Sequence, residues 1–87
     1  MHAVVVKVTI NDVDAAEKGL REQTVPGVSQ APGFVTGHWT RKGNTGVSMV
    51  IFESEEAAQG ASERIRANSP DGVTVDDVEV REVVAHA

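Results

Sequence analysis

The sequence predicts an α+β fold in which a four-stranded antiparallel sheet carries two helices on one face. Three observations predict it. The 87 residues include sixteen valines and one leucine, and side chains branched at Cβ favour strands. Apolar residues alternate with polar ones in four segments and recur at helical spacing in two others. There is no cysteine, so neither disulfides nor thiolate metal sites support the fold.

The first strand is expected from Ala3 to Ile10, where β-branched residues occupy both faces at the start. Such a pattern is typical of a strand that is covered on both sides. A helix follows, because the side-chain oxygens of Asn11 and Asp12 can cap its first turn. Its apolar stripe and its water-facing residues are expected at Val13, Ala16 and Leu20, and at Glu17, Lys18, Arg21 and Glu22.

This helix is expected to end at Pro26-Gly27, since proline and glycine both interrupt helices. The residues from Val25 to Gln30 can add one short helical turn. A second pair of the same kind, Pro32-Gly33, precedes the next strand.

A hairpin follows, with strands from Phe34 to Lys42 and from Val47 to Phe52 around the turn Gly43-Asn44-Thr45-Gly46. If Lys42 pairs with Val47, Trp39 lies opposite Val50 and Gly37 lies opposite Phe52. Gly37 then leaves room beside the aromatic side chains, either for their packing or for a small apolar cavity.

The second helix is expected to begin after Ser54, a good N-cap, and to end near Asn68. Its apolar stripe consists of small residues that allow close packing on a sheet, at Ala57, Ala58, Ala61 and Ile65. The residues Ser69-Pro70-Asp71-Gly72 predict a turn. A fourth strand then runs from Val73 towards Val84, with the acidic pair Asp76-Asp77 between Val75 and Val78.

The resulting order, β-α-β-β-α-β, is that of a ferredoxin-like fold, and residues 1–87 are expected to form a single domain. Two helices cover one face of such a sheet, but the strands carry apolar residues on both faces. Leaving these side chains in water would forgo roughly 1.5–3 kcal/mol each. The sequence therefore predicts a homodimer through the open sheet face, closing an eight-stranded barrel. The alternative is an irregular monomer with scattered exposed valines.

Charge and segment length exclude several classes of function. The net charge of −5 opposes nucleic-acid binding, which needs clustered lysine and arginine. No apolar stretch approaches the length of a membrane span, and Lys7 interrupts the apolar run at the start, so no signal peptide is indicated. We therefore expect a cytoplasmic protein without membrane or nucleic-acid partners.

Two stretches carry a family resemblance, Ala31-Pro32-Gly33-Phe34-Val35 and the run Val50 to Ala58, with sequence VIFESEEAA. They resemble the dimeric α+β barrel proteins, above all the group similar to antibiotic-biosynthesis monooxygenases (ABM-like proteins). The resemblance spans about a third of the chain, and the order of elements extends it over nearly all. It implies a ferredoxin-like dimer, and it is compatible with cofactor-independent monooxygenase-like chemistry. Haem-degrading relatives carry a tryptophan and a histidine at and after helix two, where this chain has neither.

Few residues are candidates for chemistry. His38 lies in the middle of a strand, and an imidazole can act as a base or bind a ligand; the alternative is a hydrogen-bonded histidine of the sheet. Trp39, Gly37, Phe52 and Arg41 are candidates for substrate binding, with Arg41 holding an anionic group. For Trp39 and Arg41, ordinary packing and solvation are the alternatives. His2 and His86 show no metal spacing, so we expect no metal and no cofactor.

Two functions are compatible with these features. In the first, a small apolar or aromatic molecule binds between the sheets of the dimer and undergoes cofactor-independent oxygenation or isomerisation. In the second, the dimer is a non-enzymatic stress-type or structural module with a fully packed interface. A cavity between the two sheets, lined by His38 or by Trp39, would favour the first function over the second.

Overall fold

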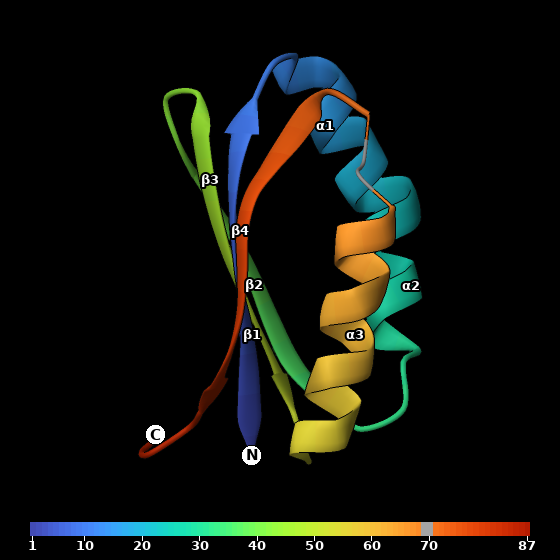
Figure 1. The fold of residues 1–87 in the computed structure, drawn as a ribbon. Helices are drawn as coiled ribbons and strands as arrows, with labels where there is room; N and C mark the ends of the chain where they lie inside the picture. The colour runs from blue at the N-terminus through green and yellow to red at the C-terminus, as the bar shows by residue number, and fades with distance from the viewer. Residues whose placement is uncertain (69–70) are drawn as a thin grey trace.

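The protein has two layers, a sheet and a set of helices that cover one of its faces (Figure 1). The computed structural model describes residues 1–68 and 71–87. The sheet is antiparallel, with strand order β2-β3-β1-β4. The elements in chain order are β1 (His2–Ile10), α1 (Val13–Gly19), η1 (Leu20–Thr24), α2 (Val25–Ser29), β2 (Phe34–Lys42), β3 (Thr45–Phe52), α3 (Glu55–Ala67) and β4 (Val73–Glu82). The predicted α+β class is confirmed, and the arrangement is compatible with a ferredoxin-like fold.

The first helical segment, residues 13–29, runs through the proline at which the sequence predicted a stop. Asp12 caps it as expected, since its side chain accepts a hydrogen bond from the Ala15 N–H at 3.2 Å. The end predicted at Pro26-Gly27 is wrong, because η1 is a wider π-helical turn in which the Val25 N–H bonds to the Leu20 carbonyl. A proline ring clashes with the carbonyl four residues earlier in a regular helix, and a π turn just before Pro26 relieves that clash.

The hairpin between β2 and β3 is two residues tighter than the sequence predicted. Lys42 pairs with Thr45 and not with Val47, so Trp39 lies opposite Ser48. Gly37 lies opposite Val50 for the same reason. The loop consists of two residues, and Gly43 adopts a φ of 61° at its first position, as in the hairpin turns that need glycine there.

The alternation in β4 changes parity at a β-bulge. Lys7 of β1 pairs with Asp77, whereas the next residue, Val8, pairs with Val75. Asp76 is therefore the extra residue, and its side chain accepts a hydrogen bond from Thr9 at 2.6 Å. The bulge brings the valines on either side of it to one face of the sheet. Ser69 and Pro70 of the turn predicted before this strand lie outside the described residues.

The core lies between the sheet and α3. It contains the buried residues Val4, Val6, Val50, Phe52, Ala58, Ala61 and Val78. The Ser54 side chain accepts from the Ala57 N–H at 3.2 Å and begins α3 where the sequence predicted. Alanines on the inner face of α3 allow the helix to lie close to the sheet, and Phe52, at 1% exposure, fills the space beneath it.

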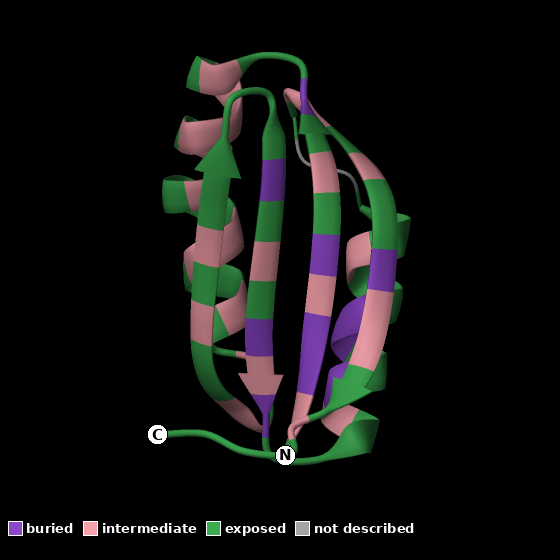
Figure 2. Ribbon diagram, turned by 90° about the vertical axis from the view of Figure 1, so that its left-hand side faces the viewer, coloured by how far each residue is buried: buried purple, intermediate pink, exposed green. Residues whose placement is uncertain are grey.

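The other face of the sheet, which faces the viewer in Figure 2, carries both buried and exposed residues along its strands. We call this side the open face. On β3, Val47 and Met49 are each 45% exposed. On β1 and β4, Lys7 pairs with Asp77, and Arg81 donates to the Glu79 carboxylate at 2.7 Å. That hydrogen bond, together with the charge of Arg81, holds the pKa of Glu79 below its usual range. Among the described residues, no helix has the length and apolar character needed to cross a membrane.

Candidate functional site

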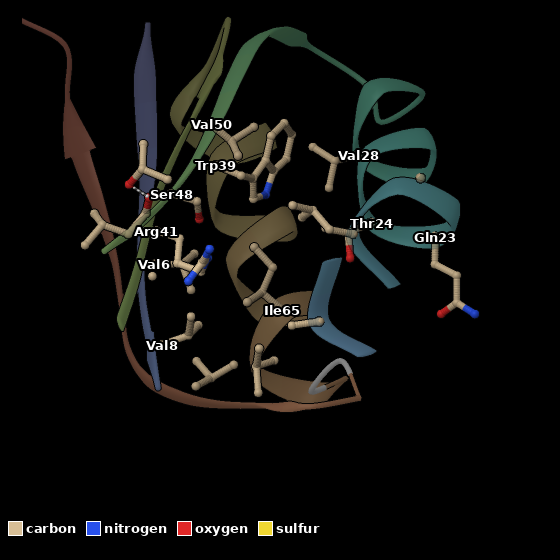
Figure 3. Close-up of a pocket in the computed structure, with 18 of the residues that line it drawn as sticks. Val6, Val8, Gln23, Thr24, Val28, Trp39, Arg41, Ser48, Val50 and Ile65 are labelled. Carbon is tan, nitrogen blue, oxygen red and sulfur yellow. Dashed lines mark hydrogen bonds between the residues drawn. The ribbon is translucent and has the colours of Figure 1, made fainter. Parts of the chain in front are cut away.

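A cavity of about 650 Å³ lies between the sheet and the first helical segment, with α3 as a further wall (Figure 3). Its walls are mainly apolar and include Val6, Val8, Val28, Trp39, Val50 and Ile65. They come from β1, α2, β2, β3 and α3. Side chains of several elements thus line a partly open pocket whose size lies within the usual range for small-molecule sites.

Trp39 forms one wall of this pocket, and Gly37 makes its position possible. The Trp39 ring lies over the strand at Gly37, so that a Cβ at residue 37 would stand 2.7 Å from ring atom Cη2 and 2.9 Å from Cζ3. Any larger residue would push the ring away. The Trp39 ring therefore occupies the room that the sequence predicted beside Gly37. The Phe34 ring lies 3.5 Å from the same Cβ position at residue 37.

We expect Gly37→Ala to displace the Trp39 ring and to lower the free energy of unfolding by about 1–3 kcal/mol, the usual cost of overpacking. Trp39 is the only tryptophan, so its fluorescence emission reports the displacement directly, and urea unfolding measures the stability. Gly60→Ala is the matched control. A Cβ at Gly60 meets nothing within 4 Å, so in α3 this change should stabilise by about 0.5–1 kcal/mol. Unchanged emission and stability in Gly37→Ala would contradict the packing.

Phe52 closes the inner part of the pocket. Its ring meets that of Phe34 edge to face, with centroids 6.3 Å apart and an interplanar angle of 79°. This geometry is favourable for aromatic pairs. Phe52 lines the pocket and belongs to the core at the same time, so the pocket wall and the stability of the fold share this side chain.

Charged side chains from β2 and the first helical segment lie at the pocket. The Arg41 Nε atom lies 3.9 Å from the Glu17 carboxylate, and the Arg21 guanidinium lies at the same distance from its other oxygen. Arg41 also donates to the Gly43 carbonyl at 3.1 Å. The side chains of Arg41 and Glu17 are about half exposed, at 46% and 45%. Both border the pocket while remaining in contact with solvent.

His38 lies on the opposite side of the sheet from these residues. It pairs with Met49 of the open face, whereas its neighbour Trp39 lines the pocket, as alternation along a strand requires. The structure thus brings together Trp39, Arg41 and Phe52 at one pocket and places Gly37 beneath the Trp39 ring. The backbone of the sheet separates His38 from a molecule in that pocket.

Glu17 and Arg21 both line the pocket although the sequence predicted them on the water-facing side of their helix. For Glu17 the reason is its place on the helix. Its position, four residues after Val13 and three before Leu20, places it at the border of the apolar stripe. Both of those residues line the pocket with it. Helical spacing is the one sequence feature that could have predicted a pocket position for Glu17. Spacing alone, however, does not distinguish a residue at the border of a buried stripe from a residue on a solvated face. Among residues 1–68 and 71–87, no three His, Asp or Glu side chains are grouped as a metal site requires.

No protein-family model matches this chain, and no curated protein matches it either. The resemblance to dimeric α+β barrel proteins therefore remains a prediction from the residues that carry it. The candidate site rests on the geometry of the pocket alone: an apolar space, one tryptophan wall and a charged border at Arg41 and Glu17.

Proposed function

We propose that this chain is a homodimeric binding protein for a small apolar or aromatic molecule, held in the pocket between the sheet and the helices. One observation carries the proposal, the space of about 650 Å³ under Trp39. A space of this size between packed elements is suited to a ligand. Val6, Val50 and Ile65 in its walls suit an apolar one.

The pocket differs in place from the ligand site expected between the sheets of a dimer. Trp39, Arg41 and Phe52 line a space within one protomer, whereas His38 would face the space between the sheets. Cofactor-independent oxygenase chemistry, which the family resemblance implies, needs a base that removes a proton from the substrate. In this pocket, Glu17 is the carboxylate that borders the ligand space. Binding itself needs no such group, and the apolar walls support it directly.

The homodimer rests on the open face. Its exposed apolar residues include Val47 and Met49, which lie on β3 and are each 45% exposed. A strip on β1 and β4 carries charges of both signs, from Lys7 and Arg81 and from Asp77 and Glu79. A surface with both signs can pair with its own copy across a twofold axis. Two ferredoxin-like β-α-β-β-α-β protomers joined in this way would form an eight-stranded barrel like that of the proteins the sequence resembles, and sedimentation tests the association.

Binding is tested by titrating the protein with N-phenyl-naphthylamine, an uncharged aromatic dye whose emission rises in apolar sites. We expect saturable binding at micromolar dye and quenching of Trp39 emission with the same midpoint, because Trp39 forms a wall of the pocket. Trp39→Leu should weaken binding at least about fivefold, since roughly 1 kcal/mol of aromatic contact is lost. Met49→Leu, on the open face, is the control and should bind as the wild type does. Absence of saturable binding would contradict the proposal and favour a purely structural dimer.

A further inference from the structure

The charges that border the pocket differ in sign from those of the chain as a whole. The protein has 13 acidic residues against 8 lysines and arginines. The pocket lining, however, includes Arg21, Arg41 and Arg64 and a single acidic residue, Glu17. A cleft lined by one sign of charge attracts ligands of the other sign. Arg21 is 80% exposed and pairs with Glu17, so the border keeps a net positive charge from Arg41 and Arg64. In an acidic protein, this excess of positive charge at an apolar pocket indicates a ligand with a negative charge.

Arg41 is the arginine best placed to meet such a group. Its Nε atom lies 3.9 Å from Glu17, which is beyond hydrogen-bond distance. Its hydrogen bond to the Gly43 carbonyl occupies one of the five N–H donors of the guanidinium. The contact with Glu17 therefore orients the side chain without using its donors. With its remaining N–H donors unused, the Arg41 guanidinium can bind a carboxylate or sulfonate through two parallel hydrogen bonds.

The position of Arg41 relative to Trp39 sets the shape of the ligand. The two residues are two apart on β2 and both line the pocket, so their side chains leave the strand about 7 Å apart. In Figure 3 both side chains extend from β2 into the pocket. A flat ring system against Trp39 would thus place an acidic substituent on its edge at the Arg41 guanidinium.

We propose that the pocket is selective for aromatic acids, with the ring system against Trp39 and the anionic group at Arg41. Glu17 competes with the ligand for Arg41 and lowers the affinity for anions. This inference rests on the proposed function, since it names the chemical class of the ligand for the same pocket.

Two dyes with the same aromatic body test the proposal. N-phenyl-naphthylamine is uncharged, and anilinonaphthalene sulfonate adds one sulfonate. We expect the sulfonate to bind about tenfold more tightly than the uncharged dye at low ionic strength, as a charge-assisted hydrogen-bond pair at a half-exposed site provides. The preference should fall at about 1 M salt, because exposed charges are then screened within about 3 Å.

Three variants test whether the preference for the sulfonate arises at Arg41. Arg41→Gln should weaken the sulfonate about tenfold and should weaken the uncharged dye much less, so that the preference for the sulfonate is lost. Glu17→Gln should strengthen the sulfonate by about two- to fivefold, the range of an exposed ion pair. Lys42→Gln removes the same charge at the neighbouring residue, which alternation places on the open face, and should change neither affinity.

The outcomes separate the two proposals. If neither dye binds, the binding function itself is wrong. If the uncharged dye binds but the sulfonate has no advantage, the pocket is apolar without selectivity for acids and the inference fails. It also fails if Lys42→Gln weakens the sulfonate as much as Arg41→Gln does, because the dye then lies on the open face or responds to net charge alone.

Discussion

Phe52→Ala is expected to lower the free energy of unfolding by about 3–5 kcal/mol, the usual cost of truncating a buried phenylalanine. Phe52 is 1% exposed and has the largest side chain of the fully buried residues in the core. Its removal also ends the edge-to-face contact with Phe34. Domains are stable by only about 5–15 kcal/mol, and a chain of 87 residues belongs near the lower end.

The effect is measured by thermal unfolding followed by circular dichroism at one fixed protein concentration. For a domain of this size, each kcal/mol shifts Tm by about 4–8 °C, so Phe52→Ala should lose at least about 12 °C. Phe52→Leu is the matched control, because it keeps most of the apolar volume and should cost less than about 1.5 kcal/mol. A Tm for Phe52→Ala within a few degrees of the wild type would place Phe52 outside the core.

The elements predicted best are those whose ends are encoded by neighbouring residues. The strand from Phe34 to Lys42 has the predicted bounds, because Pro32-Gly33 precedes it and Gly43 follows it. The helix after Ser54 also ends where predicted, since Ser54 supplies the capping oxygen and Asn68 follows its last turn. In both cases the signal lies within a few residues of the boundary.

The wrong predictions, the end of the first helix and the hairpin register, lie where the local sequence allows two alternative backbone conformations. Pro26 normally ends a helix, but the π turn at Leu20–Thr24 lets the chain continue into α2. The residues Gly43 to Gly46 all favour turns, and the hairpin register depends on which two of them form the loop. The structure uses Gly43 and Asn44. Residue propensities alone predict neither the continued helix nor the two-residue loop, because packing against the sheet decides between the alternatives.

The structure brings Trp39, Arg41 and Phe52 to one pocket, but the sequence did not predict on which side of the sheet that pocket lies. Alternation along β2 shows that His38 and Trp39 face opposite sides, but it does not say which side the helices cover. That depends on where residues 13–29 pack, and the structure puts them over Trp39. Of the two charged residues that contact each other at the pocket, the sequence predicted one. Arg41 was a candidate for an anionic group, whereas Glu17 belongs to a distant element that only the folded chain brings to 3.9 Å.

Met49→Glu is expected to separate the proposed dimer into monomers. Met49 is 45% exposed on the apolar part of the open face, and it pairs with Val5 on one side and His38 on the other. Burying a carboxylate there without a partner costs several kcal/mol, and the twofold axis introduces it twice. The dissociation constant should therefore rise at least about 100-fold, since each 1.4 kcal/mol corresponds to tenfold.

Sedimentation velocity over a range of micromolar concentrations measures this change, with Gln30→Glu as the control. Gln30 is exposed after α2, so its substitution adds the same charge away from the open face and should leave the dimer intact. A monomeric wild type, or a dimeric Met49→Glu, would rule out association through this face. The pocket lies within one protomer, so a folded Met49→Glu monomer should still bind the uncharged dye. Loss of binding in that monomer would instead show that the partner subunit supports the pocket, because the dimer then stabilises the helices that cover it.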